Sequence, residues 1–186
     1  VLTKAGVHVR SIGGAEGEEG RLNCPVGVAV DDRHVVVSSF SGHYVSLFDK
    51  ASGRFVRRIG TEGDGEGQFE YPYDVALDGE HIYVSDRDNH RVQVLTKMGV
   101  FVRVIGSGEG SGPGQLHAPR GVAVNEEHVY VCDFRNNRVQ IFRKSDGVFV
   151  RELRHAASGG LKATQPNYIS IKDDQLFVTD LANNRV

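Results

Sequence analysis

Three histidines, His34, His81 and His128, recur at a spacing of 47 residues. Histidine is a common zinc ligand, so a periodic set of this kind suggests metal chemistry. A zinc site, however, needs its ligands about 2 Å from one ion. The repeat described below places one of these histidines at a turn in each unit, far from the other two. We therefore expect these three histidines to be turn residues. The sequence predicts no metal site and no cofactor.

Other residue types with catalytic or ligand-binding chemistry also lack the required pattern. The two cysteines, Cys24 and Cys132, are too few for a disulfide framework or a thiolate metal site. The glycine-rich segment 63–67 lacks the Lys-Ser/Thr of a phosphate-binding loop and the ligand spacing of an EF-hand. No Ser-His-Asp arrangement is discernible from the spacing. The sequence predicts no catalytic residue and a protein that is not an enzyme.

The charges of the 186 residues nearly cancel, with 22 Lys and Arg against 24 Asp and Glu and a net charge of -2. This balance excludes a globally basic protein held to DNA or to anionic lipid by bulk charge. No apolar run approaches the roughly 18–20 residues that a membrane helix needs, so we expect neither a membrane nor a DNA partner. The absence of a signal-peptide pattern favours the cytoplasm. The chain begins at Val1 rather than at Met, however, so the sequence leaves the compartment open.

A period of 47 residues governs the rest of the sequence and locates the elements that must position any site. The spacing is shared by four prolines: Pro25, Pro72, Pro119 and Pro166. After each proline come short runs rich in Val, Ile, Tyr and Phe, separated by turn residues such as Asp78-Gly79. Such runs predict four strands per unit, joined by antiparallel hairpins. The predicted repeats span 23–60, 70–106 and 117–153. Residues 1–13 and 165–186 are predicted to form partial units, called partial blades below.

Four-stranded units repeated at this period predict an all-β fold, a β-propeller of four-stranded antiparallel blades. About four blades' worth of chain is present, and we expect part of a larger ring, such as a six-bladed one. The alternative is a ring closed by four blades, in which the N-terminal strand completes the last blade. The first run should line the axis. The second has one small residue per unit, so we expect Cys132 to be a packed thiol between blades.

Three motifs at fixed offsets carry a family resemblance. They are Gly-x-Gly-Gln-Phe/Leu at 65–69 and 112–116, Pro-x-Gly-Val-Ala-Val at 25–30 and 119–124, and Asp-x-x-Asn-x-Arg-Val-Gln at 86–93 and 133–140. In combination they resemble the NHL repeats of β-propellers over nearly the whole chain. The unit at 23–60 departs from the pattern, because Ser39 replaces the Asp and Gly42-His43-Tyr44 replaces Asn-His-Arg.

Acidic and basic residues flank the turn between the second and third runs at constant spacing. Because they can face each other across a hairpin, we expect charge-assisted bonds that brace the turn. A residue needed once per blade is a scaffold residue, so we interpret these pairs as structural. The pairs are Asp86 with Arg91, Asp133 with Arg138, and Asp180 with Arg185.

Residues that differ from unit to unit on the same face are the candidates for binding. In a propeller the loops before the first strand and after the second strand share one face, here called the top face. Aromatic and Arg side chains are the types that anchor interfaces. The candidates are Phe40, His43, Tyr73, Arg87, His90, Arg120, Phe134, Arg135 and Asn167.

Charge on the top-face loops favours a protein or peptide as the partner. Phosphate contacts supply most of the affinity for nucleic acid, and acidic loops oppose them. The loops before the first strands carry Glu16, Glu18, Glu19, Glu62, Asp64, Glu66, Glu70 and Glu109. Against these stand Arg21, Arg87, Arg120, Arg135, Arg154 and Lys162.

The function we expect is therefore a non-catalytic recognition module. The family resemblance implies one such role, substrate selection within a larger multidomain protein such as a ubiquitin ligase, although the chain holds no RING or B-box zinc pattern. One alternative is a single-stranded RNA-binding NHL module, because Arg and aromatic side chains can stack bases. The other is a fragment of a metal-dependent propeller enzyme whose ligands come from further blades.

Overall fold

The computed structural model describes residues 1–14, 19–154 and 165–186, and within them the fold is all-β. Three antiparallel four-stranded sheets follow one another along the chain. The first contains β1 (Pro25–Val30), β2 (His34–Ser39), β3 (Tyr44–Asp49) and β4 (Phe55–Ile59). The second contains β7 (Pro72–Leu77), β8 (His81–Asp86), β9 (Arg91–Thr96) and β10 (Phe101–Ile105). The third contains β11 (Pro119–Val124), β12 (His128–Asp133), β13 (Arg138–Arg143) and β14 (Phe149–Leu153).

Shorter elements complete the described part of the chain. A hairpin of β15 (Pro166–Lys172) and β16 (Gln175–Asp180) follows the third sheet, and a small parallel pair, β5 (Thr61–Glu62) and β6 (Gln68–Phe69), precedes the second. Two 3-10 turns, Phe40–Gly42 and Phe134–Asn136, follow β2 and β12. No helix in the described ranges is long and apolar enough to cross a membrane.

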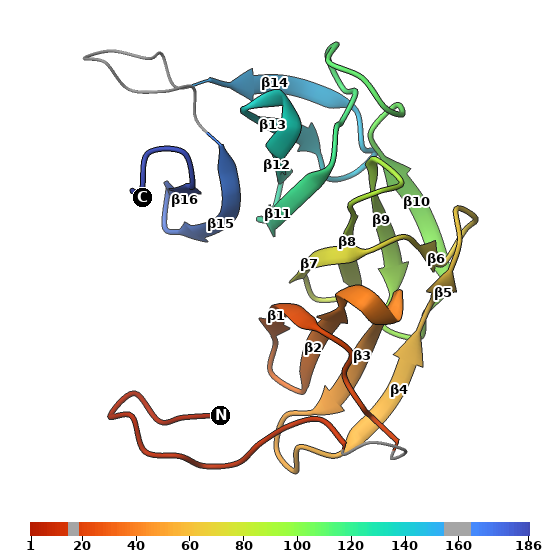
Figure 1. Cartoon of the computed structure of the whole chain (residues 1–186), viewed down its shortest axis with the longest axis vertical. Coiled ribbons are helices and arrows are strands. Elements are labelled where there is room, and N and C mark those ends of the chain that lie inside the picture. The colour runs from red at the N-terminus through yellow and green to blue at the C-terminus, as the bar shows by residue number, and fades with distance from the viewer. Residues whose placement is uncertain (15–18, 155–164) are drawn as a thin grey trace.

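The sheets stand side by side in an open arc, as blades do in a propeller (Figure 1). The first strand of each unit lies on the inner side of the arc, where β1 packs on β7, β7 on β11 and β11 on β15. Within each full sheet the strands are hydrogen-bonded in chain order from the inner to the outer side. This arrangement confirms the predicted β-propeller blades.

Apolar side chains between neighbouring blades form the core. The second and third strands are buried at nearly every position because both of their faces are covered. Phe69 and Leu116, from the loops that enter the second and third blades, are fully buried between blades. Cys132 is also fully buried, in a cluster with Ala123 and Ile169 of the inner strands. Its place confirms the sequence interpretation of a packed thiol.

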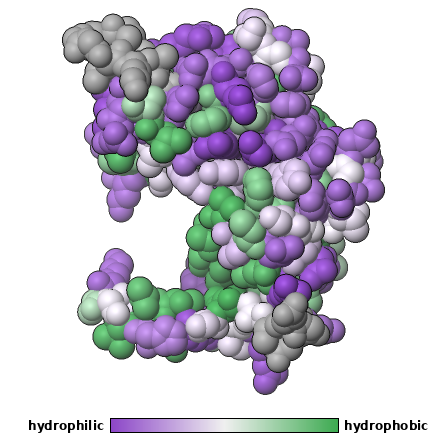
Figure 2. Space-filling view, in the orientation of Figure 1, coloured by the Kyte–Doolittle hydropathy of each residue, from purple (hydrophilic) through white to green (hydrophobic). Residues whose placement is uncertain are grey.

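The inner strand of the first blade packs on one neighbouring inner strand, β7, and leaves its other side exposed in the described structure. Val75 and Val122 are buried because each inner strand packs against the preceding blade. Val28, at the same position of β1, is 62% exposed. Figure 2 shows hydrophobic residues along this inner side of the arc and along the N-terminal segment. The arc is open between that segment and β16 (Figure 1).

Residues 1–13 differ from the sequence prediction of a partial blade. They form no sheet strand, and their only ladder contact is the isolated bridge between Leu2 and His8. A strand must pair its backbone groups with a neighbour, and none of the described strands pairs with this segment. The segment also does not pair with β16, so the four-blade closure considered above is not formed in this structure.

The two thiols should differ sharply in reactivity. Burial raises the pKa of the Cys132 thiol well above its ordinary value, whereas Cys24 is exposed. Because the thiolate is the reactive form, we expect Ellman's reagent to titrate one thiol in the native protein and two in guanidinium chloride. The Cys24→Ser variant is the control and should show none in the native state. Rapid reaction of a second native thiol would contradict the blade packing described here.

Candidate functional site

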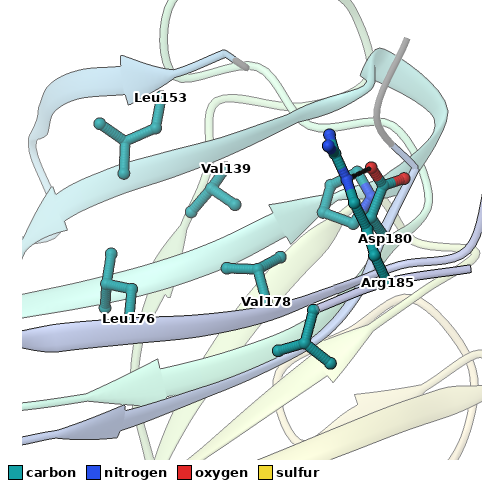
Figure 3. Close-up of a pocket in the computed structure, with 8 residues that line it drawn as sticks. Val139, Leu153, Leu176, Val178, Asp180 and Arg185 are labelled. Carbon is teal, nitrogen blue, oxygen red and sulfur yellow. Dashed lines mark hydrogen bonds and ion pairs between the residues drawn. The ribbon is translucent and has the colours of Figure 1, made fainter. Parts of the chain in front are cut away.

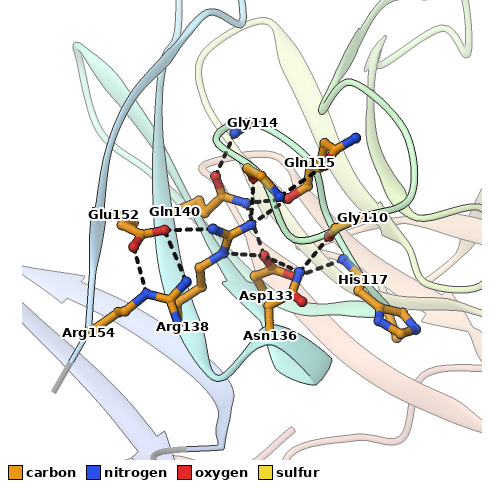
Figure 4. Close-up of polar contacts among 12 residues, drawn as sticks. Gly110, Gly114, Gln115, His117, Asp133, Asn136, Arg138, Gln140, Glu152 and Arg154 are labelled. Atoms are coloured by element: carbon orange, nitrogen blue, oxygen red, sulfur yellow. Dashed lines mark hydrogen bonds and ion pairs between the residues drawn. The ribbon is translucent and has the colours of Figure 1, made fainter. Parts of the chain in front are cut away.

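A buried ion pair braces the turn that leads from β12 to β13 (Figure 4). Asp133 Oδ2 accepts a hydrogen bond from Arg138 Nε at 2.7 Å, and both side chains are almost fully buried. Arg138 Nη2 then donates to the carbonyl oxygens of Gly112 and Gln115, at 2.8 and 2.9 Å. Asp133 Oδ1 accepts the backbone N–H of His117 at 2.7 Å. The pair thus ties the turn to the glycine-rich loop that enters the same blade.

The second blade repeats this brace, and the C-terminal hairpin keeps its ion pair. Asp86 and Arg91 approach to 2.8 Å, and Arg91 Nη2 donates to Gly65 O and Gln68 O at 2.8 and 3.0 Å. In the hairpin, Asp180 and Arg185 are 3.0 Å apart. The structure therefore brings together all three pairs singled out in the sequence.

In the first blade, other residues connect the turn to the loop that enters the blade. Tyr44, at the position of Arg91, donates its hydroxyl to the carbonyl oxygen of Arg21 at 2.7 Å. Residue 21 lies 47 positions before Gln68, so the same loop carbonyl is satisfied. The Arg58 guanidinium lies 3.9 Å from the centroid of the Tyr44 ring and covers it. In the unit at 23–60, the Tyr44 hydroxyl thus replaces the arginine guanidinium as the hydrogen-bond donor to the loop carbonyl.

Six of the candidate binding residues meet on the top face, and we call them the arginine–aromatic cluster. Arg120 is central, with its guanidinium carbon 3.4 Å from the ring centroid of Phe134 and 5.1 Å from that of Tyr73. Its Nη1 donates to Asn167 Oδ1 at 2.8 Å, and the Tyr73 hydroxyl approaches the same oxygen at 3.3 Å. The cluster consists of Phe40, Tyr73, Arg87, Arg120, Phe134 and Asn167.

The remaining two members link the cluster to the first blade. The ring centroids of Phe40 and Tyr73 are 6.1 Å apart with an edge-on geometry, and Arg87 lies 5.7 Å from the Phe40 centroid. Arg135 is exposed beside the cluster. Burial lowers the pKa of Arg120, and the charges of Arg87 and Arg135 lower it further. An arginine remains protonated at neutral pH all the same, so three cations share this surface.

His43 and His90 serve the backbone rather than the open surface. His90 Nδ1 accepts the backbone N–H of Ala118 at 3.0 Å, and His43 Nδ1 lies 3.4 Å from the backbone nitrogen of Tyr71. Ala118 and Tyr71 each precede a proline and have φ of 49° and 52°, in the left-handed region that non-glycine residues rarely adopt. Each histidine therefore helps to hold a strained residue of the next blade.

His90, Glu109 and His117 form the one group of three possible metal ligands that the described residues contain. Glu109 Oε1 lies 3.9 Å from His90 Nε2 and 3.7 Å from His117 Nε2. In a neutral ring whose Nδ1 accepts the Ala118 N–H, however, the proton is on Nε2. His90 then has no lone pair directed at Glu109, and the group does not fit a metal ion. His34, His81 and His128 begin β2, β8 and β12, one in each blade.

The sequence analysis missed three residues near the axis: Tyr71, Asp74 and Tyr168. Tyr71 stacks near Phe40 with centroids 4.9 Å apart, and Tyr168 lies 5.6 Å from Tyr73. Asp74 is buried beside a cavity of about 280 Å³, and its Oδ2 accepts the N–H of Val122 from the next blade at 3.1 Å. Asp74 and Tyr168 occupy a position that varies between units, which is the signal that could have revealed them.

An apolar pocket of about 340 Å³ separates the third sheet from the C-terminal hairpin (Figure 3). Val139 and Leu153 line one wall, Leu176 and Val178 the other, and the Asp180–Arg185 pair lies at its edge. Leu116 fills the equivalent place one blade earlier. The corresponding position, 163, lies outside the described residues, as do Glu16, Glu18 and Lys162. We therefore assign no ligand to this pocket.

Four-stranded antiparallel sheets that follow one another around an axis, with a similar brace at each turn between the second and third strands, define a segment of a β-propeller. The chain carries NHL repeats, because the family model described as "NHL repeat" matches residues 69–95 and 116–142. A search of curated proteins gives no match.

Solved structures share the fold at low sequence identity. The chain resembles Staphylococcus aureus virginiamycin B lyase with a TM-score of 0.67 and 15% identity, over 97% of this chain and 55% of that one. It resembles a chain of a nidogen/laminin complex with a TM-score of 0.68 and 21% identity, over 88% and 59%. For Kuenenia stuttgartiensis hydrazine synthase the TM-score is 0.64 with 17% identity, over 87% and 43%. The chain thus spans about half of each neighbour, and a fold shared by enzymes and a protein complex does not decide the function.

Removal of one carboxylate of a brace should destabilise the blade. The Asp86→Asn substitution leaves the Arg91 guanidinium without its ion-pair partner, and we expect the free energy of unfolding to fall by about 3 kcal/mol. Urea denaturation measures this change. Asp88→Asn is the matched control in the same turn, because its half-exposed pair with Arg87 should contribute less than about 1 kcal/mol. Equal losses in the two variants would contradict a bracing role.

Asp74 should make the stability depend on pH. Burial raises its pKa to about 6, above the ordinary 3.8. Between these values the unfolded state ionises while the folded state stays protonated, so this contribution is present below pH 4 and is lost as pH rises through 6. We expect Asp74→Asn to gain about 2 kcal/mol relative to the wild type between pH 4.5 and 7.5. Urea titrations at both values measure this gain, and a pH-independent difference would refute the assignment.

Proposed function

We propose that this chain is a non-catalytic recognition module that binds a protein or peptide through the arginine–aromatic cluster. The observation that carries the proposal is the convergence of Phe40, Tyr73, Arg120 and Phe134, from three blades, on one surface. Tyr, Phe and Arg are enriched at the centres of protein interfaces, where a few such residues provide most of the affinity.

The contrast between constant and variable positions supports this assignment. Residues needed once per blade, such as Asp133 and Arg138, are consumed by the brace and lie buried. Arg120 occupies a position that differs in all four units, and Phe134 one that holds Phe, Arg or Leu; both side chains are half-buried on the top face. Rigid strands that carry variable residues at their loop ends are a common way to build a binding surface.

Two further points favour binding over catalysis. The one group of three possible metal ligands in the described residues, His90, Glu109 and His117, does not fit a metal ion, because His90 Nδ1 accepts the Ala118 N–H. Asp74, the axial carboxylate, is engaged by a backbone N–H of the neighbouring blade and has no cation within ion-pair distance among the described residues. Neither group has the arrangement of a general acid or base beside a nucleophile.

The family resemblance extends the proposal to substrate selection within a larger protein such as a ubiquitin ligase. That role needs a free top face in the intact protein, and the arginine–aromatic cluster is the surface we assign to it. RNA binding is the alternative, because three arginines and several aromatic rings could contact a single strand.

Selection of peptides from a displayed library of random 12-residue sequences tests the proposal. We expect enriched peptides whose affinity falls about tenfold or more in Tyr73→Ala and in Phe134→Ala, the loss typical of an interface anchor. Val150→Ala, on the outer strand β14, is the matched control and should bind as the wild type does. Peptides that ignore both substitutions, or a library that yields none, would refute the proposed surface.

A further inference from the structure

Arg120 has a positive charge that no described carboxylate neutralises. Its guanidinium is covered on one side by Phe134, and its one hydrogen bond in the described structure goes to the neutral amide oxygen of Asn167. Its Nε is buried without a hydrogen-bond partner. A partly buried cation without a counterion is costly, because the low-dielectric surroundings weaken its solvation.

Two neighbouring arginines, Arg87 and Arg135, add to the excess of positive charge around Arg120. Arg87 contacts Asp88 at 3.2 Å through Nη1 but leaves its own Nε buried and without a partner. Arg135 is exposed and forms no ion pair among the described residues, and its charge acts on Arg120. The strands and turns of two blades therefore hold three guanidinium groups near one another, and only one of them, that of Arg87, has a carboxylate partner among the described residues.

The arginines of the two braces, in contrast, are paired with carboxylates. Arg91 and Arg138 each reach a carboxylate at 2.8 Å or closer, and Arg138 reaches a second one, Glu152. Arg120 forms no ion pair with any described carboxylate. We infer that the place between Arg87, Arg120 and Arg135 receives a carboxylate from the ligand, so that the bound peptide is acidic. This inference rests on the proposed function and names the chemistry that the site selects.

The surroundings favour a single carboxylate over the backbone of an RNA strand. A guanidinium binds a planar carboxylate through two parallel hydrogen bonds. A phosphate backbone brings a charge with every nucleotide, and its neighbours would meet the exposed Glu62, Glu66 and Glu109 on loops of the same face. An isolated acidic side chain avoids this repulsion. The rings of Phe40 and Tyr71 beside Arg87 provide an apolar contact for the residue next to it.

The test starts from the peptides selected on the wild-type chain. Each Asp, Glu and C-terminal carboxylate of these peptides is replaced in turn by its amide, and affinities are measured for the wild type and for Arg120→Gln. We expect one carboxylate whose loss weakens binding to the wild type about tenfold or more, the effect of a charge-assisted hydrogen bond. The same replacement should change binding to Arg120→Gln less than about twofold, since the partner is already gone.

Two variants control this experiment. Arg143→Gln removes an exposed arginine that pairs with Asp146 at the end of β13, and it should bind every peptide as the wild type does. Arg135→Gln changes an exposed side chain that has no hydrogen bond or ion pair among the described residues, so it tests the charge cluster even where Arg120→Gln unfolds the chain. We expect it to weaken acidic peptides about threefold and their amide forms not at all.

The outcomes separate this inference from the proposed function. Peptides that need Tyr73 and Phe134 but tolerate every amide replacement would overturn the acidic ligand and leave the recognition module standing. Peptides that ignore Tyr73 and Phe134 would overturn both. A uridine 12-mer that binds more tightly than any peptide, and that loses this affinity in Arg120→Gln, would assign the arginines to phosphate instead.

Discussion

The buried ion pair between the end of the second strand and the start of the third is the contact on which the top face depends. Two charges taken out of water gain little unless further hydrogen bonds satisfy them. In the second and third blades these bonds come from the glycine-rich loop, whose carbonyls accept from Arg91 and Arg138. The same loop leads into the inner strand of the same blade, so one ion pair fixes the turn, the loop and the first residues of that inner strand together.

The first blade shows that the constraint is hydrogen bonding to the loop rather than charge itself. Tyr44 supplies the donor that the arginine supplies elsewhere, and Ser39 accepts the N–H of Asn23 as Asp133 accepts that of His117. A neutral pair meets the same needs without the desolvation of two ions. The loop that enters the first blade is therefore held by the same two backbone groups as in the other blades.

Much of this architecture follows from local sequence. The 47-residue period, the hairpin turns and the Asp–Arg spacing each concern contacts within one unit, and the structure has them where the spacing requires. Asp74, Tyr71 and His90 could not be placed in this way. Their partners, Val122, Phe40 and Ala118, belong to neighbouring blades, so their roles depend on how blades are rotated around the axis. Residues 1–13 fail for a related reason, since a strand-like sequence forms no strand without a paired neighbour.

A net charge of -2 for the chain is compatible with a cluster of three arginines on the top face. The attraction of these arginines for a ligand acts at short range, whereas the charges of the rest of the chain act from a greater distance. At physiological ionic strength, charges more than about 8 Å apart in solvent are largely screened. The exposed acidic loops therefore discourage a long polyanion, which must pass close to several of them. They would exert little force on a single ligand carboxylate bound beside Arg120, where the aromatic rings would shield the contact from water and strengthen it. A surface of this kind can select an acidic side chain in a folded or peptide partner while rejecting the nucleic acids that an arginine cluster would otherwise attract.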